Sequence, residues 1–170
     1  MALRGLLDSL LANERPVTPT LEPAPNQTEP DSAATEQLKL KNTPGPLKLK
    51  VGETVTVPLE LGIKPGLHVQ ANPAGLKTLI PLQVRLNSAP RLRVDNPVYP
   101  PGHTFHLPGS DFDLLVYSDS VRVDLPLTAL AGAAGEQFAV DGYIIYQSCD
   151  ERMCFSPDSL SFSLSVSVER

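Results

Sequence analysis

The sequence predicts an all-β domain, an antiparallel β-sandwich, preceded by a short helix and a proline-rich linker. From Leu38 onward, apolar and polar residues alternate in short runs, which is the pattern of strands with one buried face. The alternating runs are Leu47–Val51, Val55–Val57, Leu59–Leu61, Leu82–Leu86, Leu92–Val94, Val121–Leu125 and Phe162–Val168. Glycine and proline turn signals separate these runs, and many short strands joined by regular turns are typical of a sandwich.

The chain divides into three parts. Residues 1–12 carry leucines at helical spacing and predict a short amphipathic helix, which would be marginal without something to pack on. We expect it to be either the end of an upstream domain or a helix docked on this one. Residues 13–36 hold five prolines and no aromatic residue, which predicts an extended linker. Residues 37–170 form the sandwich domain.

Composition and charge exclude several classes of function. The chain has 170 residues, of which 41% are hydrophobic, enough for a single core. Its net charge of -5, with no cluster of lysine and arginine, argues against nucleic acid as a partner. The chain contains no run of about 18 apolar residues, so the sequence predicts no membrane span. The first 13 residues do not resemble a secretory signal. Two cysteines close together indicate one deliberate pair. The protein would be either cytosolic or an excised piece of an exported or anchored protein, and we favour an excised, exported domain because persistent disulfides belong to oxidising compartments.

Cys149 and Cys154 flank a short polar turn that follows the apolar run Tyr143–Tyr146. Four residues between the cysteines allow their side chains to face each other across the mouth of a hairpin. That spacing can satisfy the short Cα separation that a disulfide requires.

Three roles for this pair follow from the residues. A structural staple is disfavoured, because closing so small a ring stabilises a protein by only about 2 kcal/mol, against nearly 5 for a loop of about 100 residues. A zinc site usually takes four ligands, and His103 and His106 lie in a proline- and glycine-containing loop without a metal-binding spacing. Thiolates would also suit Cu(I). We favour a redox-active disulfide and expect no metal and no cofactor.

The neighbours of the pair do not favour a thiolate. Asp150 and Glu151 lie beside Cys149, Arg152 is the nearby cation, and no helix N-terminus is evident. We therefore expect thiols of ordinary or raised pKa, which react when a partner supplies the activated thiol.

The segments Tyr146-Gln147-Ser148-Cys149 and Cys154-Phe155-Ser156-Pro157 resemble the N-terminal periplasmic domain of the DsbD thiol:disulfide interchange proteins. Two supporting similarities lie within Gly66–Leu82 and Tyr117–Pro126. Together they span about residues 45 to 168.

The resemblance implies an immunoglobulin-like sandwich with the cysteine pair at one end. It implies a domain that takes electrons from a thioredoxin-like module and passes them to periplasmic disulfide-containing proteins, as part of a protein-disulfide reductase. Cys154 would form the mixed disulfide with partners, and Cys149 would resolve it. Any membrane attachment would lie in a part of the full-length protein outside this chain.

The resemblance also implies neighbours for the pair. The family shields its cysteines with a loop that bears an aromatic cap, which corresponds to Pro100–Asp113, and either Phe105 or Phe112 would be the cap. The alternative for both residues is ordinary core packing. His68 falls where the family often has a histidine. The remaining neighbours expected from the motif are Tyr146, Gln147, Phe155 and Pro157.

A second function remains open from the sequence. The domain would then be a non-catalytic immunoglobulin-like module that binds a partner or handles copper, with a permanently closed structural disulfide.

Overall fold

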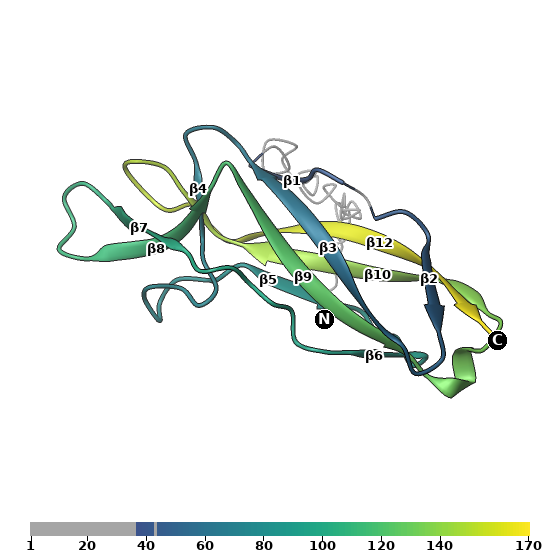
Figure 1. Cartoon of the computed structure of the whole chain (residues 1–170). Coiled ribbons are helices and arrows are strands. Elements are labelled where there is room, and N and C mark those ends of the chain that lie inside the picture. The colour runs from purple at the N-terminus through teal and green to yellow at the C-terminus, as the bar shows by residue number, and fades with distance from the viewer. Residues whose placement is uncertain (1–36, 43) are drawn as a thin grey trace, which may run out of the picture.

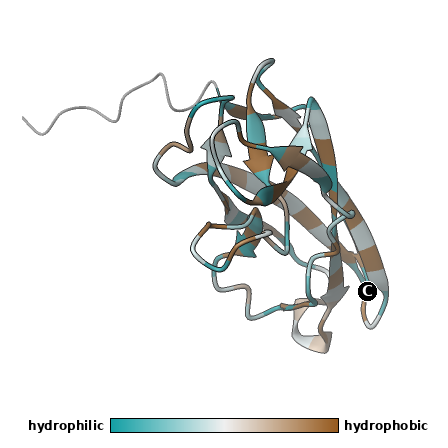
Figure 2. Ribbon diagram, turned by 90° about the vertical axis from the view of Figure 1, so that its left-hand side faces the viewer, coloured by the Kyte–Doolittle hydropathy of each residue, from teal (hydrophilic) through white to brown (hydrophobic). Residues whose placement is uncertain are grey.

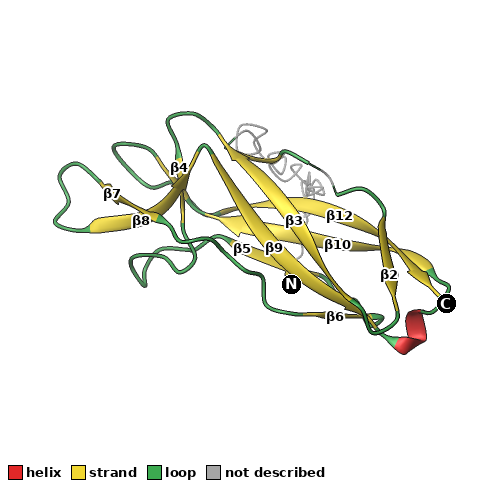
Figure 3. Cartoon of the chain, in the orientation of Figure 1, coloured by secondary structure: helices red, strands yellow, loops and turns green. Residues whose placement is uncertain are grey.

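The computed structural model describes residues 37–42 and 44–170, so the predicted helix and linker at residues 1–36 lie outside the described part. Figures 1 and 3 show a molecule built almost entirely of strands. The strands are β1 (Leu38–Leu40), β2 (Leu47–Lys50), β3 (Thr54–Ile63), β4 (His68–Gln70), β5 (Gln83–Leu86), β6 (Leu92–Val94), β7 (His103–His106), β8 (Asp113–Ser118), β9 (Ser120–Ala129), β10 (Gln137–Tyr146), β11 (Ser148–Cys149) and β12 (Asp158–Glu169). A single 3-10 turn, η2 (Ala131–Ala133), interrupts the described strands. Within this part of the chain, no helix is long and apolar enough to cross a membrane.

The strands form three four-stranded sheets. The first sheet has the order β1-β3-β9-β6, the second β2-β12-β10-β5 and the third β11-β4-β8-β7. Every pairing is antiparallel except that of β2 with β12. Buried side chains of β3 and β9 share one hydrophobic core with those of β10 and β12, so the first two sheets pack face to face. The prediction of an all-β domain is confirmed.

Period-two patterning explains how the long strands build this core. In β12, Phe162, Leu164, Val166 and Val168 are buried, while the serines before and between them face outward or lie at the surface. Figure 2 shows the same alternation as hydrophobic bands along the long strands. The apolar residues of the predicted run Phe162–Val168 therefore face the core, as the alternation predicts.

Two runs that the sequence separates, Val55–Val57 and Leu59–Leu61, belong to the single strand β3. Pro58 lies between them and pairs with Asp124 of β9. The backbone N–H of Asp124 donates to the carbonyl of Val98 on the side away from β3. This register leaves Pro58 at a position where β9 requires no N–H donor from β3, so the proline is accommodated within the strand.

The segment Pro100–Asp113, expected to be a loop, contains the strand β7. β7 pairs with β8 in register from His103 opposite Val116 to His106 opposite Asp113. Gly109 has a φ of +82° between the two strands, a conformation that glycine adopts without a side-chain clash. The segment is therefore one arm and the tip of a β-hairpin, and its aromatic residues are held by sheet pairing.

The third sheet lies at one end of the sandwich, where β4, β7 and β8 gather in Figure 1. Val69 and Tyr117 point from one of its faces into the main core. Leu114 and Val116 belong to a second, smaller cluster that also contains Cys149. One face of this sheet is thus part of the sandwich, and the other face carries the cysteine pair.

Gly142 tests how tightly the second sheet is packed. A Cβ at this position would lie 2.6 Å from Cζ of Phe162 and 2.7 Å from the carbonyl oxygen of Arg85. We expect Gly142→Ala to lower the free energy of unfolding by about 2 kcal/mol through overpacking, measured by urea denaturation. The matched control is Gly132→Ala, whose Cβ would meet nothing within 4 Å. Equal stability of the two variants would contradict the register described above.

Candidate functional site

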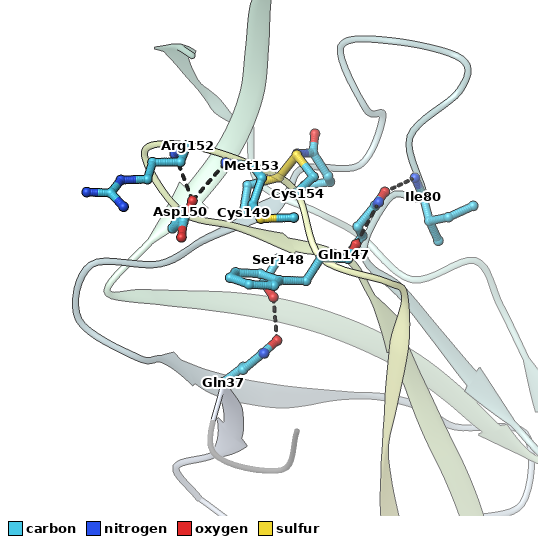
Figure 4. The surroundings of a disulfide bond; sticks show 11 residues. Gln37, Ile80, Gln147, Ser148, Cys149, Asp150, Arg152, Met153 and Cys154 are labelled. Carbon is cyan, nitrogen blue, oxygen red and sulfur yellow. Dashed lines mark hydrogen bonds between the residues drawn. A yellow bond between two sulfur atoms is a disulfide. The ribbon is translucent and has the colours of Figure 1, made fainter. Parts of the chain in front are cut away.

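Cys149 and Cys154 are joined by a disulfide across a tight hairpin. Their sulfur atoms are 2.04 Å apart and their Cα atoms 3.9 Å apart. The two residues face each other as an antiparallel bridge, and the N–H of Phe155 donates to the carbonyl of Ser148 at 2.8 Å. Figure 4 shows the disulfide at the mouth of this hairpin. Backbone hydrogen bonds hold the two cysteines opposite each other independently of the sulfur–sulfur bond.

The four-residue turn between the cysteines is closed by its own polar groups. The N–H of Asp150 donates to the carbonyl of Met153 at 2.9 Å. Oδ1 of Asp150 accepts the backbone N–H groups of Arg152 at 2.7 Å and Met153 at 2.8 Å. These two hydrogen bonds lower the pKa of the Asp150 carboxyl below its ordinary value. The carboxylate is thus bonded to the turn backbone, and the side chain of Met153 is 56% exposed at the tip.

The two cysteines differ in burial. Cys149 is 0% exposed, whereas Cys154 is partly exposed. In thiol–disulfide exchange the attacking thiolate must reach one sulfur of the bond in line with it. Of the two cysteines, Cys154 is the residue with solvent-exposed surface.

Sheet register determines which side chains share the face that carries Cys149. Cys149 pairs with His68 of β4, and His68 pairs with Ser118 of β8. On β7, His103 pairs with Val116, and Phe105 is two residues further along. Because side chains alternate along a strand, His68, Ser118, His103 and Phe105 all lie on the same face as Cys149.

An apolar cluster covers the buried side of the disulfide. Leu114, Val116 and Cys149 form its buried centre. The partly buried residues packed on it are Leu76, Leu79, Phe105, Leu107 and Cys154. Of the two phenylalanines expected as caps, Phe105 thus lies in the cluster with both cysteines, and Phe112 is 45% exposed at the hairpin tip.

His68 connects this cluster to a chain of hydrogen bonds. Its ring centroid is 4.1 Å from that of Phe105. Nδ1 of His68 lies 2.7 Å from Oγ of Ser118, and the same Oγ lies 3.0 Å from Nε2 of His103. Burial, followed by the nearby His103, lowers the pKa of His68 below its ordinary value. The fold therefore favours the neutral form of this imidazole more than water does.

His106, in contrast, lies on the opposite face of β7 from His103, because the two residues are three positions apart. Its Nδ1 is 3.0 Å from Oδ1 of Asp113. The two histidines that the sequence offered as metal ligands thus point to different sides of the strand. Among the residues that the structure describes, no group of three or more histidine, cysteine or acidic side chains is arranged to hold a metal ion.

The motif residues around the cysteines hold the hairpin to the rest of the domain. Tyr146 is buried in the main core and donates its hydroxyl to Oδ2 of Asp158 at 3.1 Å. The side chain of Gln147 bridges two segments, since its Nε2 donates to the carbonyl of Phe155 and its Oε1 accepts the N–H of Ile80. Phe155 is half-buried and Pro157 is exposed.

Three polar residues at the site were not singled out from the sequence, namely Gln70, Ser148 and Ser118, which lies between His68 and His103. Gln70, which ends β4, is 0% exposed and places its Nε2 3.0 Å from Sγ of Cys149. Ser148 is buried beside Cys149 and donates its hydroxyl to Oε1 of Gln37. A lone glutamine in a run of three strand residues gives no signal in the sequence. The long-range pairing of β4 with β11 is what brings Gln70 to the sulfur.

The fold and the site define a β-sheet domain with a disulfide held across a hairpin at one end. A family model described as thiol:disulfide interchange protein DsbD, N-terminal, matches residues 35–165, and the chain belongs to this family. No curated protein sequence matches the chain.

Solved structures extend the comparison at the level of the fold. The N-terminal periplasmic domain of ScsB from Proteus mirabilis is similar with a TM-score of 0.51 and 15% identity, over 69% of this chain and 42% of that one. The DsbD N-terminal domain of Neisseria meningitidis, in the reduced form, has a TM-score of 0.45 and 18% identity, over 65% of this chain and 76% of that one. This chain thus spans less than half the length of the ScsB chain.

The lowered pKa of His68 predicts a dependence of stability on pH. In the unfolded chain the imidazole titrates near 6.5, and in the folded domain below that value. Its contribution to stability is therefore present above about pH 6.5 and is lost as the pH falls through the folded pKa. We expect the free energy of unfolding to fall more steeply with acidification in the wild type than in His68→Gln, measured by urea denaturation.

His106→Gln is the matched control for this prediction, because the His106 ring is exposed. That variant should keep the His68-dependent part of the slope. Identical slopes in the wild type and in His68→Gln would show that His68 is not held neutral by the fold.

Proposed function

We propose that this domain relays electrons by thiol–disulfide exchange through Cys149 and Cys154, as one part of a protein-disulfide reductase. The observation that carries the proposal is the unequal burial of the pair: Cys149 is enclosed, whereas Cys154 is partly exposed on a hairpin at the end of the domain. Membership of the DsbD N-terminal family supports it. The fold is assigned as an immunoglobulin-like sandwich within this proposal.

The exchange is a two-step transfer of two electrons. A thiolate of the reducing partner attacks Sγ of Cys154, a bond forms between these two sulfurs, and the Cys149–Cys154 bond breaks with its electron pair on Sγ of Cys149. The partner's second thiol loses its proton, attacks its own sulfur in the mixed disulfide and releases Cys154 as a thiolate. The partner is then a disulfide, and the domain holds two reduced cysteines.

In the second half of the cycle, the reduced domain passes the two electrons to a different protein, the substrate. Cys154 as a thiolate attacks a substrate disulfide and forms a mixed disulfide, with one substrate sulfur leaving as a thiolate. Cys149 as a thiolate then attacks Sγ of Cys154, which restores the domain's disulfide and releases the substrate fully reduced. This order gives Cys154 the contact with partners and Cys149 the resolving step.

The proposed partners are a thioredoxin-like module as reductant and periplasmic disulfide-containing proteins as substrates. The location is periplasmic or otherwise exported, where disulfides persist, in line with the description of the ScsB domain as periplasmic. Residues 13–36, with their five prolines, are proposed as an extended spacer in front of the sandwich domain.

Single-cysteine variants test the roles of the two sulfurs. Reduced Cys149→Ser should accumulate a mixed disulfide with an oxidised substrate protein, because Cys154 attacks and no second thiol resolves the bond. Cys154→Ser should accumulate far less, since its remaining sulfur is buried. Non-reducing electrophoresis and mass spectrometry of the trapped species give the measurement. Trapping through Cys149 would reverse the two assignments.

The reduction potential separates the relay from a structural disulfide. Equilibration of the wild-type chain with glutathione buffers should give a potential less negative than about -300 mV, within the range of exchange proteins. A value below about -300 mV would favour the alternative, a binding module whose disulfide stays closed.

We further propose that Phe105 is the aromatic cap of the pair and that Phe112 is not. Phe105 packs in the cluster that contains both cysteines, and Phe112 is exposed at the tip of the same hairpin. Phe105→Ala should accelerate reduction of the disulfide by dithiothreitol severalfold, because it uncovers the sulfurs. Phe112→Ala is the matched control and should react at the wild-type rate. Equal rates in all three proteins would rule out shielding by Phe105.

A further inference from the structure

Gln70 is a fully buried amide that touches the disulfide. Its side chain is 0% exposed, and Nε2 donates to Sγ of Cys149 at 3.0 Å and lies 3.9 Å from Sγ of Cys154. The backbone of Gln70 is fixed on both sides, since its N–H donates to the carbonyl of Gln147 and its carbonyl accepts the N–H of Leu82. The amide is therefore held against the sulfurs by the same strand pairing that places Cys149.

The other half of this amide has no partner. Oε1 of Gln70 is buried and accepts no hydrogen bond from the residues that the structure describes. Two further buried polar side chains are bonded: Thr128 to Thr54, and Ser148 to Gln37. Burying an unpaired amide oxygen destabilises a fold, and an apolar side chain would fill the same space without that cost. The contacts of the oxidised domain therefore do not explain why an amide occupies this position.

Reduction of the disulfide would provide hydrogen-bond partners for both ends of the amide. A disulfide sulfur is a weak acceptor, whereas a thiolate carries a full negative charge and accepts a charge-assisted hydrogen bond from an amide N–H. A thiol is also a donor, and its S–H can bond to the amide oxygen that stands unpaired in the oxidised domain. The amide N–H can thus bind the thiolate form of a reduced cysteine, and the amide oxygen can bind its thiol form.

We propose that Gln70 stabilises Cys149 as a thiolate when the disulfide opens and again when Cys149 resolves the mixed disulfide. This inference rests on the proposed exchange function and adds the group that acts on the buried sulfur. As the bond to Cys154 breaks, the electron pair moves onto Sγ of Cys149, 3.0 Å from Nε2 of Gln70. Cys149 has no access to water, so the amide N–H takes the place of the solvent that would otherwise stabilise the charge.

The test compares the acidity of Cys149 with and without the amide. In a Cys154→Ser background, the ultraviolet absorbance of the thiolate is followed as a function of pH. Gln70→Met keeps the length of the side chain and removes both the donor and the acceptor. We expect it to raise the titration midpoint of Cys149 by about one unit, the effect of losing one charge-assisted hydrogen bond. In the chain with both cysteines, the same substitution should slow reduction by dithiothreitol at least about threefold, because a thiol of higher pKa leaves more slowly.

Gln70→Glu is the second variant and keeps the shape of the side chain. It replaces the amide donor by a carboxyl group and should raise the titration midpoint of Cys149 further. This second variant keeps the proposal testable if circular dichroism shows that Gln70→Met does not fold. Thr128→Val is the matched control, because it removes a buried polar group of the first sheet and should leave the midpoint unchanged. His68, His103, Asp150, Glu151 and Arg152, the titratable side chains near the pair, are identical in all of these proteins.

A midpoint that stays at the wild-type value in the Gln70 variants would overturn the proposal. The readouts use protons and a small dithiol, so they do not depend on any protein partner. Failure of the exchange function would appear instead as the absence of trapped substrate with Cys149→Ser, while the effect of Gln70 on Cys149 remained.

Discussion

The pairing of β11 with β4 is the constraint on which the site depends. It sets Cys149 opposite His68 and Ser148 opposite Val69. Because side chains alternate along strands, this register turns Val69 into the main core and Cys149 to the other face. A shift by one residue would exchange the two faces and bury the side chain facing the disulfide among the aliphatic residues of the sandwich. The small third sheet therefore separates the cysteine pair from the main core.

The site that results is built mainly of neutral groups. His68 has a lowered pKa beside Phe105, and Gln70 is an uncharged amide against the sulfur. The carboxylate of Asp150 is bonded to the backbone of its own turn. Within the described residues, the buried sulfur is contacted by an amide and apolar side chains, without a cation or a helix terminus at hydrogen-bonding distance. The disulfide is thus surrounded by uncharged groups and by one carboxylate that is bonded to its own turn.

Much of the sandwich could be predicted from the sequence, and the site only in part. Strands such as β12 bury one face over many residues, so their alternation is visible without knowledge of the fold. β7 was missed because its four residues follow two prolines and a glycine, and only pairing with β8 makes them a strand. The cysteines were evident from their spacing. Gln70 and Ser118 were not, because their roles depend on partners about 50 to 80 residues away in the sequence.

The closeness of the two cysteines in the chain limits how strongly folding is coupled to redox state. Backbone hydrogen bonds join the hairpin on both sides of the pair, and the disulfide closes a ring with a sequence separation of only 5. Such a ring contributes about 2 kcal/mol of loop-closure entropy, which corresponds to only about 45 mV in a two-electron couple. By thermodynamic linkage, ring closure shifts the potential of the folded domain from that of the unfolded chain by no more than this amount. Side chains that contact the two sulfurs, such as Gln70, are therefore the groups whose substitution can shift the potential beyond this amount.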